Sequence, residues 1–176
     1  SGVTGNYYLH VRACDKSTNN NCSEWTVSNV FKLDNTEPAN PTLSENKTET
    51  WSKSHSLTAS ASDGHSGLVK IYYCWSTSKT GCTPSSTSTL NSNKITINKT
   101  DGTGKYYVRA QAEDAMGHKS EIVTSTGTFW FDNTAPNSPS YSLNGSGSTF
   151  SKSYTITVTY TDGNSGYGAT EYCWNT

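Results

Sequence analysis

The chain has 176 residues and a formal net charge of −1, and only 15% of its residues are charged. Because Lys and Arg are not in excess, we expect no nucleic-acid partner, and without a run of about 18 apolar residues we expect no membrane insertion in this segment. The aromatic fraction of 11% argues against disorder, and the many Ser, Thr, Asn and Gly residues are typical of short strands joined by polar turns.

The sequence repeats itself with a period of 98 to 99 residues. The Asp-Asn-Thr-x-Pro run at 34–38 recurs at 132–136, which is 98 residues later. The Ser-Asp-Gly-His-Ser-Gly turn at 62–67 is echoed at 161–166, and here the displacement is 99 residues. One inserted residue accounts for the difference between the two displacements.

These matches predict three domains. Residues 1–36 align with the back of the repeat and are expected to be the C-terminal half of a preceding repeat, because Gly-Asn-Tyr-Tyr at 5–8 matches Gly-Lys-Tyr-Tyr at 104–107. Residues 37–134 form a complete repeat, and residues 135–176 are the N-terminal half of a following repeat.

Two strands with one buried face are predicted in residues 1–36, because apolar residues alternate there with polar ones. The residues expected to point inward are Tyr7, Leu9, Val11, Ala13, Phe31 and Leu33. Between the two strands, Cys14 and Cys22 enclose seven residues of turn character, so we expect a disulfide that staples this loop.

Prolines follow each predicted repeat boundary, at Pro38 and Pro41 and again at Pro136 and Pro139. Each proline fixes its own φ and biases the preceding residue towards an extended conformation. The linkers are therefore expected to be short and stiff, and to hold the repeats apart in a rod.

The complete repeat shows the same alternation in four strong strands. The expected inward residues are Leu57, Ala59, Ala61, Ile71, Tyr73, Trp75, Tyr106, Val108, Ala110, Ala112, Phe129 and Phe131. Weaker strands near 41–45, 84–90 and 93–98 bring the total to about seven. Seven short strands in about 100 residues predict an all-β, immunoglobulin-like two-sheet sandwich.

A second disulfide is predicted between Cys74 and Cys82, which also enclose seven turn-like residues. Cys173 aligns with Cys74 and is expected to be unpaired in this fragment, with a partner eight residues on, beyond Thr176. Paired cysteines imply an oxidising compartment. Zinc is not expected, because there is no Cys-x-x-Cys and the four histidines have no spacing that converges on one ion.

Asp63 and Asp162 are weak calcium candidates, because a carboxylate in a turn can bind calcium together with carbonyl oxygens. The stronger interpretation is that each aspartate caps its own Asp-Gly turn. We therefore expect no metal and no other cofactor. No Gly-x-Ser-x-Gly or phosphate-binding loop is present, so no catalytic residues and no enzyme activity are expected.

Outward-facing aromatic residues allow two interpretations. Trp130, Tyr107 and Trp25 are candidate contacts for a sugar or an adhesive partner. They are equally well explained as cross-strand pairs on a solvated sheet face. In the earlier copy of the repeat, Lys32 stands at the position equivalent to Trp130. A binding face common to the repeats therefore does not run through this position.

The whole chain resembles the tandem immunoglobulin-like repeats of bacterial cell-surface proteins. The resemblance rests on the Gly-x-Tyr-Tyr strand that runs into Glu-Asp-Ala-Met-Gly at 113–117, on the turn at 63–67, and on the Asp-Asn-Thr-Ala-Pro run that follows the last strand. The Tyr-Cys-Trp strand at 73–75 with Cys82 after it is similar to variants of these repeats in Firmicutes.

The resemblance implies an extracellular location at the bacterial cell surface and a non-catalytic role as the stalk of an adhesin-like protein. The partners would then be neighbouring repeats of the same chain. One alternative is a module that binds a host glycan or protein, and another is a decoration or tail component of a phage virion.

The two half-repeats raise the further question of whether they complement each other between molecules. Thr176 aligns near position 77 and Ser1 near position 101, so about two dozen residues of a repeat would be absent from such a composite. On sequence grounds this favours an arbitrary boundary over designed complementation.

Overall fold

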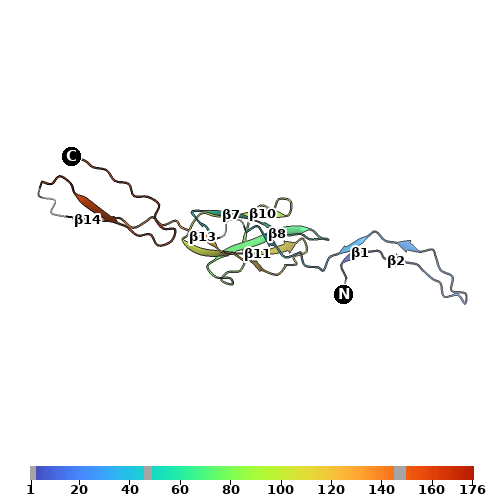
Figure 1. The fold of residues 1–176 in the computed structure, drawn as a ribbon. Helices are drawn as coiled ribbons and strands as arrows, with labels where there is room; N and C mark the ends of the chain where they lie inside the picture. The colour runs from blue at the N-terminus through green and yellow to red at the C-terminus, as the bar shows by residue number, and fades with distance from the viewer. Residues whose placement is uncertain (1–2, 46–48, 145–149) are drawn as a thin grey trace.

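The computed structural model describes residues 3–45, 49–144 and 150–176 and shows an elongated molecule (Figure 1). A central body lies between a leading segment, residues 3–36, and a trailing segment, residues 135–176, which lie on opposite sides of it. Strands, turns and irregular connections make up the described residues, which confirms the all-β prediction. Among these residues there is no helix of the length and apolarity needed to cross a membrane.

Two sheets build the central body. The smaller sheet has the order β10-β7-β5, and its strands are β5 (Thr42–Leu43), β7 (His55–Ser60) and β10 (Lys94–Lys99). The larger sheet has the order β6-β13-β11-β8-β9, and its strands are β6 (Trp51–Ser52), β8 (Leu68–Ser76), β9 (Ser86–Thr87), β11 (Gly104–Asp114) and β13 (Phe129–Phe131). A further strand, β12 (Val123–Thr124), pairs with β11. The β13–β6 pair is parallel, whereas the long β11–β8 pair is antiparallel.

A single apolar core fills the space between these two sheets. Its buried residues come from both sheets and are Leu57, Ala59, Ile71, Ile95, Ile97, Val108, Ala110, Phe129 and Phe131. The alternation of β11 places its inward residues here because successive side chains of a strand point to opposite faces. Trp75 contacts Phe129 and Phe131 edge to face, with ring centroids 5.3 and 5.6 Å apart. The central body is therefore a β-sandwich.

The leading segment contains four short strands that pair as β1–β4 and β2–β3. Their bounds are β1 (Gly5–Tyr7), β2 (His10–Val11), β3 (Thr26–Val27) and β4 (Phe31–Leu33). The predicted burial of one face is wrong here: Leu9 is 56% exposed and Phe31 54%, whereas their counterparts Val108 and Phe129 are fully buried. No second sheet of described residues covers this face, so the alternation that buries β11 leaves these strands open to solvent.

The trailing segment is an antiparallel hairpin of β14 (Ser140–Asn144) and β15 (Thr155–Thr159), followed by residues that form no strand. Ile156 and Val158 align with the buried Leu57 and Ala59, but they are 37% and 39% exposed. The cause is the same as in the leading segment, because a single sheet has nothing to bury its apolar face against.

The three weaker predicted strands are present but shorter or shifted by a residue, as β5, β9 and β10. The sequence pattern did not indicate β6 and β12, which are only two residues long and are defined by their partners β13 and β11.

Equivalent hydrogen bonds recur along the chain, with donors displaced by 99 residues and acceptors by 97. The amide of Leu9 donates to the hydroxyl of Ser28 at 2.9 Å, and that of Val108 donates to the hydroxyl of Ser125 at 3.2 Å. In the same way, the amide of Ala13 donates to Ser23 Oγ and that of Ala112 to Ser120 Oγ. The leading segment thus reproduces the local backbone geometry of the central β11 region without its second sheet.

Candidate functional site

The carboxylate of Asp34 joins the leading segment to the central body. Asp34 follows β4, and its Oδ1 accepts hydrogen bonds from the amide and hydroxyl of Thr36, at 3.0 and 2.6 Å. Its Oδ2 accepts a hydrogen bond from the amide of Ser66, at 2.9 Å, across the joint. The backbone adds a second link, since the amide of Ala39 donates to the carbonyl of Ser62 at 2.8 Å.

Asp132 forms the same joint between the central body and the trailing segment. Oδ1 of Asp132 accepts from the amide and hydroxyl of Thr134, at 3.1 and 2.7 Å, and Oδ2 accepts from the amide and hydroxyl of Ser165, at 2.9 and 2.6 Å. The backbone link recurs as well, from the amide of Asn137 to the carbonyl of Thr161 at 2.9 Å. The chain therefore contains two joints built from the same residue types, and the second adds a hydrogen bond from the serine hydroxyl that the first lacks.

Hydrogen bonding keeps both joint carboxylates ionised. Donors on Ser66, and then on Thr36, hold the pKa of Asp34 well below its usual range. Ser165 and Thr134 have the same effect on the pKa of Asp132. A charged carboxylate that accepts amide and hydroxyl hydrogen bonds makes stronger contacts than a neutral acceptor would.

The turns that receive these carboxylates are shaped by the two calcium candidates. Oδ2 of Asp63 accepts from the amides of His65 and Gly67, at 3.1 and 2.7 Å. Asp162 makes the equivalent pair with Asn164 and Gly166, at 3.3 and 2.7 Å. Gly67 and Gly166 have φ values of 91° and 78°, a left-handed conformation that favours glycine. In the described structure, both aspartates cap their own turns and present the amide of the intervening serine to the preceding linker.

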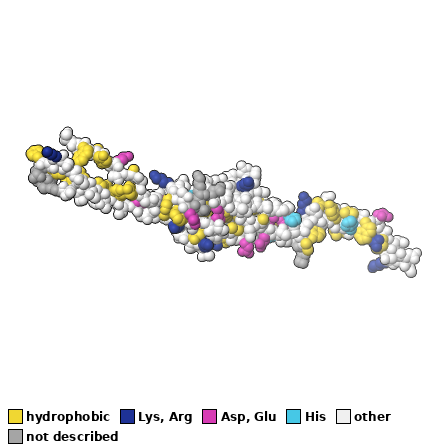
Figure 2. Space-filling model, in the orientation of Figure 1, with side chains coloured by type: hydrophobic (Ala, Val, Ile, Leu, Met, Phe, Trp, Pro, Cys, Tyr) yellow, Lys and Arg dark blue, Asp and Glu magenta, His cyan; other side chains and the backbone are white. Residues whose placement is uncertain are grey.

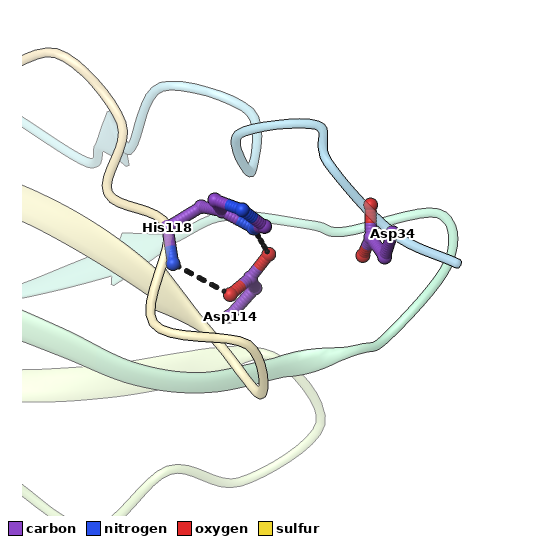
Figure 3. Close-up of side chains that lie close together, drawn as sticks. All are labelled: Asp34, Asp114 and His118. Atoms are coloured by element: carbon purple, nitrogen blue, oxygen red, sulfur yellow. Dashed lines mark hydrogen bonds and ion pairs between the residues drawn. The ribbon is translucent and has the colours of Figure 1, made fainter. Parts of the chain in front are cut away.

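Close to the first joint lies a pair that the sequence did not indicate, Asp114 and His118 (Figure 3). The Asp114 side chain is fully buried and accepts hydrogen bonds from the amides of Met116 and His118 and from Nδ1 of His118, at 2.8 to 2.9 Å. Burial opposes ionisation of Asp114, but these hydrogen bonds outweigh it and lower its pKa. The hydrogen bond with Asp114 raises the pKa of His118, and the charges of Asp34 and Glu37 add to this effect.

Asp34, Asp114 and His118 each offer a potential metal-ligand atom, and these atoms lie within 4.8 Å of one another. It is the only such group in the described ranges. Both oxygens of each carboxylate already accept hydrogen bonds, those of Asp34 from Thr36 and Ser66 and those of Asp114 from Met116 and His118, so these atoms are already engaged without an ion. Sequence reasoning missed this group because 80 residues separate Asp34 from Asp114, although the recurrence of Asp34 as Asp132 was a usable signal.

Two of the three predicted contact aromatics share the outer face of the larger sheet. Trp130 lies 5.2 Å from Trp51 between ring centroids, and Nζ of Lys105 lies 4.0 Å from its ring centroid. Tyr107 lies two residues after Lys105 on β11 and faces the same way. Nζ of Lys79 lies 5.8 Å from the centroid of the Tyr107 ring. Trp25 belongs instead to the leading segment, where the guanidinium of Arg12 lies 4.7 Å from its ring.

These contacts have the pattern of cross-strand packing. Lys105 and Trp130 are direct partners in the β11–β13 register, and Trp130 and Trp51 are direct partners in the β13–β6 register. Such pairs stabilise sheets by roughly 0.2–1 kcal/mol each. The structure does not bring Trp25 into this cluster.

Disulfides close the two short cysteine loops, Cys14–Cys22 between β2 and β3 and Cys74–Cys82 at the end of β8. The guanidinium of Arg109 donates to the carbonyl of Cys82 and fastens that loop to β11. Cys173 has a free thiol and is exposed.

No protein-family model matches the chain, and no curated protein matches it in sequence. The arrangement of the site therefore has to be interpreted from its own chemistry. Two ionised carboxylates, each bound to a serine of the following segment, can fix the position of one segment relative to the next.

Proposed function

We propose that the chain is a non-catalytic structural segment of a stalk, built from tandem immunoglobulin-like repeats and displayed outside a bacterial cell. The observation that carries this proposal is the repeated joint, in which Asp34 and Asp132 each bind the serine of the next turn, Ser66 and Ser165. Because this aspartate–serine contact recurs at both boundaries between segments, we infer that its role is to connect one repeat to the next.

The joint supports a rod because it restrains the linker at several points. The aspartate binds across the boundary. Two residues after Pro38, the side-chain oxygen Oδ1 of Asn40 accepts a hydrogen bond from the amide of Glu121 at 3.1 Å. Proline further limits the bending of the linker between these contacts. Three segments joined in this way produce the extended outline in Figure 2.

The division into one complete and two partial repeats is supported by burial. Equivalent apolar positions are buried in the central sandwich and exposed in the leading and trailing segments, as expected for repeats of which only half is present. The two short-loop disulfides suit a location outside the cytoplasm, where thiols oxidise.

The proposal is tested by small-angle X-ray scattering of the chain with both joint aspartates replaced, Asp34→Ala and Asp132→Ala. We expect the distribution of interatomic distances to broaden. The scattering curve should become that of a chain whose segments move relative to one another. Asp101→Ala is the matched control, because Asp101 binds only Lys99 within the central body. A scattering profile that does not change in the double variant would contradict the stalk proposal.

A second candidate function, glycan binding, is favoured by an open hollow of about 970 Å³ beside Trp51. Ser52, Ser54 and Asn98 line it with hydroxyl and amide groups that suit a sugar. Binding on a glycan array that is lost with Trp51→Ala and Trp130→Ala would support this function. Lys105 lies over the Trp130 ring and limits its use as a stacking platform, so the stalk is the better-supported proposal.

A further inference from the structure

The outer face of the larger sheet, which is turned away from the core, carries lysine ammonium groups that lie over aromatic rings. Nζ of Lys105 lies 4.0 Å from the centroid of the Trp130 ring, and Nζ of Lys79 lies 5.8 Å from that of the Tyr107 ring. A cation over the face of a ring is attracted by the electrons of the ring. These contacts therefore hold the two ammonium groups at fixed places on the face.

A third contact of this kind lies further along the same face, at Tyr72. This residue is the partner of Gln111 in the β8–β11 register. The ammonium groups of Lys119 and Lys70 lie 4.9 and 5.9 Å from the centroid of its ring. Lys119 also forms an ion pair with Glu113, at 3.4 Å. Lys70 therefore supplies the uncompensated charge at this end of the face.

The outer face is positively charged, although the chain as a whole has a formal net charge of −1. Among the outward positions of β8, β11 and β13, Glu113 is the only acidic residue, and it is paired with Lys119. Within the described ranges, no ion pair involves Lys70, Lys79 or Lys105. Three ammonium groups are thus held in place without a carboxylate to neutralise them, and this charge is complementary to an anionic partner.

The spacing of the three contacts indicates an extended partner. Along β11, Tyr107 follows Lys105 by two residues, and Gln111, which marks the position of Tyr72, follows Tyr107 by four. At about 3.4 Å per residue, the contacts lie about 7 and about 14 Å apart. Duplex nucleic acid carries one phosphate per about 1.7 Å, which is far denser. Acidic polysaccharides in which uncharged sugars separate the charged ones have a charge spacing closer to that of this row.

We propose that the outer face of the larger sheet binds a linear acidic polysaccharide whose chain runs along β11. Carboxylates of the sugars accept hydrogen bonds from the ammonium groups of Lys70, Lys79 and Lys105. Because these groups lie over the rings, the rings position charges and do not stack on sugars, so a neutral glycan is not the ligand of this face. The face lies on the central body, away from the joints, and its role is independent of theirs.

Biolayer interferometry of the full chain against hyaluronan tests the proposal. Hyaluronan is linear and carries a carboxylate on every second sugar. We expect binding that weakens as the salt concentration rises, because salt screens exposed charges. The triple variant Lys70→Gln, Lys79→Gln and Lys105→Gln should weaken the affinity by about tenfold or more, since three exposed ion pairs are lost.

The matched control is the triple variant Lys16→Gln, Lys94→Gln and Lys152→Gln. It makes the same change in net charge at three exposed residues that lie outside the larger sheet. Equal loss of affinity in the two triple variants would overturn the proposal, because the position of the lysines would then not matter. It would also be overturned if the unaltered chain did not bind hyaluronan, or if it bound neutral dextran or duplex DNA as tightly.

Protection from acetylation tests the site in the unaltered protein. With acetic anhydride as the reagent and mass spectrometry as the readout, bound hyaluronan should slow the acetylation of Lys70, Lys79 and Lys105. Acetylation of Lys94, which lies on β10 in the smaller sheet, should not change. Equal protection of all four lysines would refute the assignment of the site. Neither experiment alters the joints, so a negative result would leave the stalk proposal standing.

Discussion

The carboxylate of Asp132 accepts two hydrogen bonds from Ser165, one from the amide at 2.9 Å and one from the hydroxyl at 2.6 Å. The two residues are 33 positions apart and belong to different segments of the chain. The same pairing of an aspartate with a serine 32 positions later occurs at Asp34 and Ser66. A contact that recurs with this spacing is a property of the repeat and not of one surface.

Removing the Ser165 hydroxyl should raise the pKa of Asp132. Ser165→Ala deletes the shorter of the two hydrogen bonds and leaves the amide in place, so the carboxylate loses part of the stabilisation of its charged form. A carbon-detected NMR titration of the carboxyl groups measures the change. Ser151→Ala serves as the control, because the Ser151 hydroxyl donates only to Ser153. An unchanged Asp132 titration in Ser165→Ala would show that the hydroxyl contributes nothing.

Phe129 and Phe31 allow a comparison of the same residue type at the same repeat position in two environments. Phe129 is fully buried, so Phe129→Ala should lower the free energy of unfolding of the central body by about 3–5 kcal/mol. Phe31 is 54% exposed, and Phe31→Ala should cost less than about 1 kcal/mol. Urea unfolding followed by tryptophan fluorescence measures both. Equal costs would mean that Phe31 is covered in solution.

The Cys74–Cys82 disulfide should contribute to the stability of the central body. In the chain-entropy model, closing so short a loop is worth about 2–3 kcal/mol, and the double variant Cys74→Ala with Cys82→Ala should lose that amount. Differential scanning calorimetry measures the loss. Removing Cys14 and Cys22 in the same way should leave the central transition in place, since that loop lies in the leading segment.

The His118–Asp114 pair predicts a specific dependence of stability on pH. The folded pKa of His118 lies above its unfolded value near 6.5, so its contribution is complete below about pH 6.5 and is lost as pH rises through the folded pKa. The folded pKa of Asp114 lies below 3.8, so its contribution is present above 3.8 and is lost as pH falls through the folded pKa.

We therefore expect the thermal midpoint of the central body to decrease as the solution becomes alkaline. His118→Gln should flatten this part of the profile, because glutamine does not titrate. Circular dichroism melts between pH 4 and 9 measure both proteins. Parallel profiles for the wild type and His118→Gln would show that another group controls the response.

Alternation along the strands made much of the fold predictable. Leu57, Ala59, Phe129 and Phe131 were expected inward and are buried, because the period of a strand is visible in the sequence without knowledge of its partners. The same pattern at Leu9 and Phe31 predicted burial that does not occur. Alternation identifies which face of a strand is apolar, but whether that face is covered depends on a second sheet.

The joints could not be predicted from local pattern. Asp34 follows a strand, and its sequence neighbours explain only its bonds to Thr36. Its bond to Ser66 and its proximity to His118 depend on how the following sandwich is placed, which spacing does not encode. The sequence indicated Asp63 and Asp162 instead, because an aspartate that caps its own Asp-Gly turn can be recognised from neighbouring residues alone.

The parallel contact between β6 and β13 has a consequence for mechanics. The chain enters the central body from the leading segment, passes through β5 and β6, and leaves through β13 into the trailing segment. Tension on the two ends would draw β6 and β13 past each other along their length. Their backbone hydrogen bonds and the Trp51–Trp130 contact would then bear the load together, and not one after another as when a hairpin is peeled open. Pulled along its axis, the sandwich is loaded in shear at the place where two tryptophans lie side by side.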